Sequence, residues 1–210
     1  MDIHKHYEAQ NTEQSISEQD PFTLERYEQF NRFLPKGAIH VLDIGCNTGR
    51  GGERLKEISS EITLSGLDCV QSRLDALPSC YAGRVYGLSN KIPTPDQTYD
   101  AIVAGEFLEH LYPSDVDPTL CECQRVLKIG GVLLMTTPNP GYLKNLWGGE
   151  TVFGTSHLTQ HHHAVLKQRL LMHGFSRVKI FGSGKMTRYI GSRIPLLNLY
   201  GSYLITAIKI

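Results

Sequence analysis

An acid, two glycines and an asparagine stand at alternate positions of the stretch VLDIGCNTG, as Asp43, Gly45, Asn47 and Gly49. Glycine loses more conformational freedom on ordering than any other residue, so a cluster of it usually marks a positive φ or a ligand against bare backbone. Asparagine enters the left-handed conformation more readily than most residues, so Asn47 can replace a glycine in such a turn. The stretch predicts a turn that a ligand approaches closely.

The spacing of the glycines distinguishes the classes of ligand that such turns bind. A phosphate-binding P-loop needs G-x-x-x-x-G-K-[ST], and no G-K-[ST] follows Gly45. A dinucleotide fingerprint needs G-x-G-x-x-G, but its second and third glycine positions hold Asn47 and Arg50. The spacing therefore disfavours a nucleoside triphosphatase and a nicotinamide oxidoreductase.

Short, almost continuous apolar runs alternate with helical patterns between residues 39 and 137, which is typical of a parallel sheet covered on both faces. We expect an α/β fold with a doubly wound, mostly parallel sheet, whose ligands bind beyond the carboxyl ends of the strands. The expected strands are 38–44, 62–67, 84–88, 100–105 and 132–137; the expected helices are 50–58, 70–77 and 117–127, with a helical turn at 106–111 and a helix stop at Gly130-Gly131.

The N-terminal part predicts one further helix. Asp20 is a capping residue and Pro21 suits the first helical position, so the helix is expected to begin there and to end at Leu34, before Pro35. It would carry an aromatic face that includes Tyr27 and Phe30. We expect a single domain in which residues 1–36 form a helical cap and residues 37–210 form the core.

The glycine stretch VLDIGCNTGRGG resembles motif I of the class I S-adenosylmethionine-dependent methyltransferases, of the type 11 kind. The resemblance continues in order along residues 39–210: Asp68 ends the second strand, TYDAIVAGEFLEHL resembles the fourth strand and its E-H turn, LCECQRVLKIGGVLLMTTPNP resembles the helix and fifth strand, and SHLTQHHHAVLKQRLLMHGF resembles a late helix that ends with Gly-Phe. The resemblance implies a seven-stranded, Rossmann-like fold and an S-adenosylmethionine-dependent methyltransferase.

The resemblance also implies roles at the cofactor site. The turn 45–49 would take the methionyl end, Asp68 would bind the ribose diol, and Asp43 would hold the turn or reach the ammonium through water. The family's acid after the third strand is replaced by Leu88, so the adenine edge is expected to meet backbone at 88–89. The expected cofactor-binding residues are Asp43, Gly45, Cys46, Asn47, Gly49, Asp68, Cys69, Leu88, Ser89, Gly105 and Glu106.

Catalytic residues are expected after the fourth and fifth strands. Methyl transfer is an in-line displacement, so the protein mainly orients the reactants in a dry pocket. A hydroxyl acceptor must also lose a proton, which a general base assists. His110 is the first candidate for the base, with Glu109 beside it, and His157 is the second. The alternative for both histidines is a partly buried structural role.

A metal ion is a further possibility. Glu106, Glu109 and His110 form E-x-x-E-H, which is similar to a divalent-metal motif in some quinone O-methyltransferases, and such ligands could hold Mg²⁺. The favoured alternative is a helix-capping acid and a packing residue, so no metal ligand is predicted. Consecutive residues do not point together, so the run 161–163 of three histidines is expected to be a solvated helix start.

The sequence only partly determines which molecule accepts the methyl group. Methyltransferases of exocyclic amines in DNA or RNA carry [DNS]-P-P-[YF] after the fourth strand, where this chain reads AGEF. The 21 basic and 21 acidic residues balance, which also argues against a nucleic-acid partner. Tyr142, Trp147, Phe153 and Tyr189 predict an aromatic-lined pocket. We expect O-methylation of a sugar or glycan precursor or of a small metabolite; the alternative is a methyltransferase-like subunit that binds the cofactor without catalysis.

The composition and the two ends of the sequence indicate the cellular compartment that we expect. The five cysteines are odd in number and lack C-x-x-C spacing, which favours neither a disulfide framework nor a zinc ribbon. A reduced, cytoplasmic setting fits this usage. The polar N-terminus is unlike a signal peptide, and the apolar stretch 194–210 is shorter than the ~20 residues of a spanning helix, so no membrane span is expected. The oligomeric state is left open.

Overall fold

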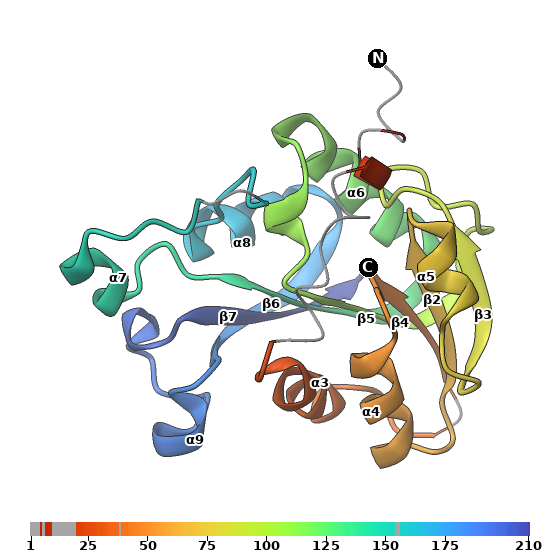
Figure 1. Ribbon diagram of the computed structural model, residues 1–210, viewed down its shortest axis with the longest axis horizontal. Helices are drawn as coiled ribbons and strands as arrows, with labels where there is room; N and C mark the ends of the chain where they lie inside the picture. The colour runs from red at the N-terminus through yellow and green to blue at the C-terminus, as the bar shows by residue number, and fades with distance from the viewer. Residues whose placement is uncertain (1–4, 6, 10–19, 38, 154–155) are drawn as a thin grey trace.

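A seven-stranded sheet forms the centre of the molecule in the computed structural model, which describes residues 5, 7–9, 20–37, 39–153 and 156–210 (Figure 1). The strand order is β3-β2-β1-β4-β5-β7-β6. The strands are β1 (His40–Ile44), β2 (Thr63–Asp68), β3 (Tyr81–Tyr86), β4 (Tyr99–Gly105), β5 (Leu127–Pro138), β6 (Phe175–Ser183) and β7 (Ser202–Lys209).

The pairing confirms the predicted doubly wound, mostly parallel sheet. Strands β1 to β5 pair in parallel, and β7 runs antiparallel to both β5 and β6. The chain moves outward from β1 to β3 and then returns to β4 on the other side of β1. The loops after β1 and β4 therefore diverge, which opens a crevice at the carboxyl ends of these strands.

Helices cover both faces of the sheet. In Figure 1, α3 (Thr23–Asn31) and α4 (Arg50–Ile58) lie below it, and α6 (Pro113–Val126) and α8 (His163–Met172) lie above it. Each face has its own hydrophobic cluster, with Phe30 and Leu55 in the first and Leu120 and Leu170 in the second. The shorter elements are α5 (Gln71–Asp75), η1 (Leu108–His110), α7 (Leu143–Gly148), α9 (Thr187–Ile190) and η2 (Leu197–Leu199). In the described part of the chain, no helix is long and apolar enough to cross a membrane.

The N-terminal helix is shorter than predicted, because α3 begins at Thr23 and ends at Asn31. Asp20 does not cap a helix that starts at Pro21; its carboxylate accepts the Phe22 N–H at 2.9 Å and the Thr23 hydroxyl at 3.3 Å. These two bonds close a turn that contains Pro21. Phe33 lies beyond the helix and still packs against the first cluster.

Helix α6 begins earlier than predicted, at Pro113, and Pro118 lies inside it. Pro113 occupies the first turn, where its missing N–H needs no partner. The helix continues through Pro118 because Val116 and Leu120, on either side of the proline, are buried in the second cluster. Tertiary packing thus outweighs the local signal at Asp117-Pro118.

Gly130-Gly131 does not stop this helix, which ends at Val126. Strand β5 begins at the next residue, and both glycines lie within it. Tyr99 of β4 pairs with Leu127 and Ala101 pairs with Val132, so extra residues of β5 form an irregularity at this point. Gly130 has a φ of 78°, which suits this irregularity.

A buried carboxyl group ties α3, β1 and β3 together. Asp43 of β1 accepts the hydroxyl protons of Tyr27 from α3 and Tyr81 from β3, each at 2.6 Å. A methyl group at Gly51 would overlap the Tyr27 ring, and one at Gly52 would overlap the Tyr81 hydroxyl. Both glycines therefore leave room for the tyrosines. Tyr27 is part of the interior, and the boundary between residues 1–36 and 37–210 stays a prediction.

We predict that Tyr81→Phe lowers the free energy of unfolding. The change leaves one oxygen of a fully buried carboxyl group without its donor, which costs about 1–3 kcal/mol. Chemical denaturation monitored by circular dichroism measures the loss. Tyr189→Phe is the matched control, because Tyr189 is 71% exposed. Equal stability of the two variants would show that this hydrogen bond contributes nothing to the fold.

Candidate functional site

A cavity of about 440 Å³ lies at the carboxyl ends of the strands. It is lined by the turn after β1, by the ends of β2 and β4, and by η1. Helix α3 closes it from one side, and the segment around Ser156 closes it from another. The elements that form the cavity are therefore far apart in the sequence and meet at the crevice between β1 and β4.

The turn after β1 presents backbone to this cavity. Gly45 and Asn47 have φ values of 66° and 49°, so the predicted left-handed conformation of Asn47 is confirmed. A Cβ atom at Gly45 would lie 2.6 Å from the Phe107 ring. Glycine is thus required here both by its φ and by the approach of Phe107. Gly45, Cys46 and Asn47 line the cavity, as predicted for a site that binds through backbone.

Asp68 stands at the end of β2 and lines the cavity beside this turn. One carboxylate oxygen accepts the Asn47 N–H at 3.0 Å, and the other accepts the Val70 N–H at 2.9 Å. Arg73 lies 3.9 Å from the carboxylate. Burial raises the pKa of Asp68. Because a carboxylate oxygen has two lone pairs, both oxygens retain capacity to accept bonds from a ligand.

Arg26 is a cavity residue that the sequence prediction missed. Its guanidinium group pairs with Asp20 at 2.9 Å and lies 3.7 Å from Glu106. Burial lowers the pKa of Arg26, but the two acids more than offset this and raise it, so the group stays charged. The Nε atom is buried and has no hydrogen-bond partner among the residues that the structure describes. The sequence did hold a signal for this role. Arg26 stands four residues before Phe30, which puts a charged side chain on the helix face that was predicted to be buried.

The other predicted cofactor-binding residues divide into two groups. Those that line the cavity are Cys69, Leu88, Ser89, Gly105 and Glu106. Asp43 and Gly49 are not among the lining residues: Asp43 holds the two tyrosines, and Gly49 precedes the first residue of α4. Asp43 therefore joins β1 to α3 and β3, and both roles expected for it at the cofactor site stay predictions.

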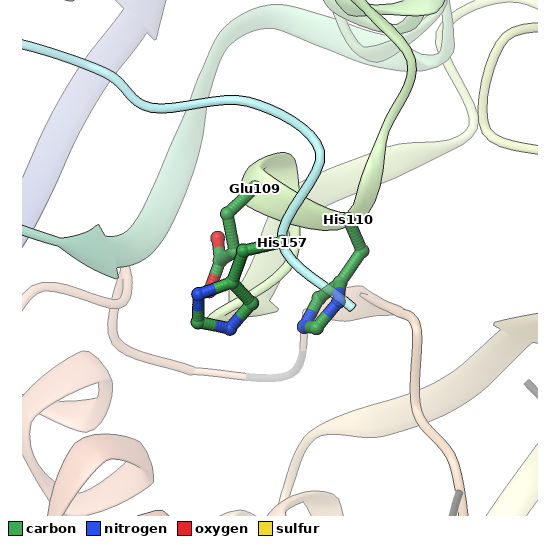
Figure 2. A group of neighbouring side chains, drawn as sticks. All are labelled: Glu109, His110 and His157. Carbon is green, nitrogen blue, oxygen red and sulfur yellow. The ribbon is translucent and has the colours of Figure 1, made fainter. Parts of the chain in front are cut away.

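The three predicted catalytic residues lie close together, with one ligand atom from each within 4.8 Å of the others. His110 and His157 both line the cavity, and their ring centroids are 5.0 Å apart (Figure 2). Glu109 lies behind them, is 1% exposed and accepts the Thr137 hydroxyl at 3.1 Å. Burial and the neighbouring His157 lower the pKa of His110 to about 4. Burial, with a contribution from Glu106, raises the pKa of Glu109.

One less favoured possibility and one prediction about this region differ from the arrangement of the described residues. Glu106 does not join Glu109 and His110, because its carboxylate accepts the Ser202 hydroxyl at 3.2 Å and faces Arg26. Its φ of 50° turns the chain at this residue. The predicted aromatic pocket does not form either: its four residues are absent from the cavity lining, and Trp147 is 83% exposed. The four are Tyr142, Trp147, Phe153 and Tyr189.

The run of histidines at 161–163 was predicted to be a solvated helix start, and one of the three differs from this prediction. Helix α8 does start at His163, and His162 and His163 are exposed. His161 is buried, and its Nε2 atom lies 2.9 Å from the Thr159 hydroxyl. It therefore packs against the segment before α8 and is not part of a solvated helix start.

Known proteins resemble this chain in sequence and in fold. Residues 42–135 match a protein family described as a methyltransferase domain. The chain is 35% identical over 114 residues to malonyl-[acyl-carrier protein] O-methyltransferase 1 of Coxiella burnetii, covering 54% of this chain and 39% of the relative. It is 36% identical over 109 residues to a fatty-acid O-methyltransferase of Mycolicibacterium smegmatis, covering 49% of this chain and 38% of the relative.

The match to these curated relatives thus spans about two fifths of their length. A solved structure gives fuller coverage: a SAM-dependent methyltransferase from Archaeoglobus fulgidus is 25% identical, with a TM-score of 0.70, covering 89% of this chain and 92% of the other. The sheet order, the glycine turn and the acid that ends β2 define a Rossmann-like methyltransferase fold. The chain is similar to class I S-adenosylmethionine-dependent methyltransferases, in sequence over residues 42–135 and in fold over most of its length.

We predict that Asp68→Asn weakens S-adenosylmethionine binding by roughly 1.5–3 kcal/mol, because it removes a charged acceptor from the cavity wall. Isothermal titration calorimetry measures the affinity. Asp75→Asn is the control, because Asp75 is an exposed acid on α5. An affinity unchanged by Asp68→Asn would show that Asp68 does not bind the cofactor. A parallel measurement of thermal unfolding separates this effect from loss of the turn that Asp68 supports.

Proposed function

We propose that the chain binds S-adenosylmethionine in this cavity and methylates an oxygen atom of a small acceptor. The observation that carries the proposal is the position of the glycine turn, Asp68 and Arg26 on one cavity that ends at His110 and His157. S-adenosylmethionine, when bound, supplies a methyl group on a positively charged sulfur. The protein orients the reactants and excludes water around them.

Arg26 and the glycine turn fit the methionyl end of the cofactor. The buried Nε of Arg26 lies 3.7 Å from the Glu106 carboxylate and makes no hydrogen bond to the described residues, and a ligand carboxylate can accept one from it. A Cβ atom at Gly105 would lie 3.0 Å from the Arg26 side chain, so the bare backbone of Gly105 lets the guanidinium reach this part of the cavity. Glu106 and Asp20, which already face Arg26, provide acceptors for the ammonium group of the cofactor.

Asp68 fits the ribose and the loop after β3 fits the adenine. The Asp68 carboxylate is fixed by two backbone N–H groups, so it needs no reorganisation to accept bonds from a diol. Leu88 and Ser89 line the same part of the cavity, although the Ser89 hydroxyl already pairs with that of Thr119 at 2.8 Å. The apolar side chain of Leu88 and the backbone at 88–89 can hold an adenine ring and its edge.

The acceptor is proposed to bind at the end formed by His110 and His157, with Glu109 behind them. Both imidazoles face the cavity and can contact an acceptor oxygen. Two of the similar curated proteins are named as O-methyltransferases, which supports an oxygen acceptor. The four aromatic residues that suggested a pocket for a sugar or small metabolite do not line this cavity, so they give no support to a sugar or glycan over another small metabolite.

The decisive test measures binding and turnover separately. We expect calorimetry to show binding of S-adenosylmethionine and no binding of NAD, because the turn lacks the dinucleotide spacing. Candidate sugars, carboxylic acids and phenols are then incubated with cofactor labelled in the methyl group, and labelled products are identified by mass spectrometry. Binding without any labelled product would favour the alternative of a non-catalytic subunit. Binding of NAD in place of S-adenosylmethionine would contradict the proposal.

The role of Arg26 gives a further prediction. S-adenosylhomocysteine carries an amino acid end that 5′-methylthioadenosine lacks, so the wild-type protein should prefer the former. In Arg26→Gln this preference should shrink by about 1.5–3 kcal/mol, the range for a hydrogen bond to a charged group. Calorimetry with both ligands measures the difference, and Arg193→Gln, at an exposed arginine, is the control. A preference as large as in the wild type would place the amino acid end away from Arg26.

A further inference from the structure

Three side chains that can ligate a metal ion meet at the acceptor end of the cavity. Glu109 and His110 come from η1, and His157 comes from the segment between α7 and α8. One ligand atom from each residue lies within 4.8 Å of the other two. Neighbouring residues ordinarily point apart, yet Figure 2 shows Glu109 and His110 both leaving the tight turn of η1 toward the His157 ring.

The hydrogen bonds of the two histidines leave a free lone pair on each ring. His110 Nδ1 lies 2.9 Å from the Ser156 carbonyl oxygen, and His157 Nδ1 lies 2.7 Å from that of Val152. A carbonyl oxygen only accepts, so both Nδ1 atoms carry the proton and both Nε2 atoms carry the lone pair. Histidines that bind metals show the same arrangement, because the second bond fixes the tautomer and the ring orientation.

The Glu109 carboxylate gives a second, independent indication of a bound cation. The side chain is 1% exposed, and one carboxylate oxygen is buried with no hydrogen-bond partner in the described part of the chain. Its other oxygen has only the Thr137 hydroxyl at 3.1 Å. A buried carboxylate oxygen without a partner is costly, and such groups are normally paired or bound to a metal. A cation beside the two imidazoles would satisfy this oxygen.

The backbone holds the third ligand against the other two. The Glu109 carbonyl oxygen accepts the N–H groups of Leu158 at 2.7 Å and Thr159 at 3.1 Å. The Thr159 hydroxyl donates to the Leu108 carbonyl oxygen at 3.0 Å. The segment that carries His157 is therefore bonded to η1 directly after the histidine, at Leu158 and Thr159. This preorganisation is what a metal site requires of its supporting residues.

We propose that Glu109, His110 and His157 bind a divalent ion of the Zn²⁺, Fe²⁺ or Co²⁺ class. Two imidazoles and one carboxylate suit these ions, whereas Mg²⁺ and Ca²⁺ prefer ligand sets made of oxygen. Zinc bonds are about 2.0–2.2 Å long, so its ligand atoms lie roughly 3.3 Å apart and these side chains would close by small torsional changes. Three protein ligands leave a further position on the ion open.

The role of this metal site in catalysis rests on the proposed function. The proposal that the site binds a metal ion does not. His110 and His157 line the cavity, so the open position faces the place proposed for the acceptor. An acceptor hydroxyl bound there loses its proton to solvent more easily, because the ion stabilises the negative oxygen. That oxygen then forms the bond to the methyl carbon, while the carbon–sulfur bond breaks and its electron pair stays on sulfur as a neutral thioether.

The test uses the full chain after treatment with a chelator and removal of the chelator. Co²⁺ is added and the visible absorption of the protein-bound ion is recorded; Zn²⁺ should displace the signal and Mg²⁺ should not. Glu109→Gln and His157→Gln should each lower the Co²⁺ affinity by at least about 10-fold, a loss seen even for residues that only orient ligands. His162→Gln is the control for surface histidines, because His162 is exposed.

Thermal unfolding provides a second readout that a structural role would not produce. Zn²⁺ should raise the Tm of the wild type and of His162→Gln, since it binds only the folded site, and should leave that of Glu109→Gln unchanged. Absence of a Co²⁺ spectrum, or equal affinity in the wild type and the two ligand variants, would overturn the metal site. Cofactor binding and methyl transfer that persist in that case would leave the proposed function standing.

Discussion

The hydrogen bonds between Asp43 and two tyrosines are the constraint on which the cofactor end of the cavity depends. Asp43 is at the end of β1, Tyr27 is on α3 and Tyr81 is on β3, so one buried group fixes three elements. Burial raises the pKa of Asp43 to about 7, while the two hydroxyl donors lower it by stabilising the charged form. The glycines at 51 and 52 are necessary because larger side chains would displace the tyrosine rings.

The predictions that succeeded concern features set by local chemistry. The spacing of Gly45 and Asn47 could be read from sequence because positive φ restricts the residue types that a turn accepts. Asp68 could be placed because a parallel sheet brings its strand ends to one edge, so the end of β2 must lie near the turn after β1. The sheet itself followed from continuous apolar strands. These inferences need no knowledge of how distant segments pack.

The predictions that failed depend on such packing. Pro118 stays inside a helix because buried neighbours on both sides keep it there, and Gly130 lies in a strand because β5 has an irregular register opposite β4. Arg26 was missed because its role appears only when α3 folds over the cavity. The convergence of His157 with Glu109 was equally invisible, since backbone bonds from residues 158 and 159 create it. In each case a long-range contact decides what the local sequence leaves open.

The two ends of the cavity are built in different ways. Backbone of the turn after β1 and one acid at a strand end form the cofactor side, and both lie within residues 42–135, which match the family. Arg26 and His157 lie outside those residues and reach the cavity from α3 and from the segment before α8. Sheet geometry therefore positions both the turn after β1 and Asp68 at one edge of the sheet. The group of Glu109, His110 and His157 combines two residues within the matched range with one outside it, so the matched residues alone do not determine its chemistry.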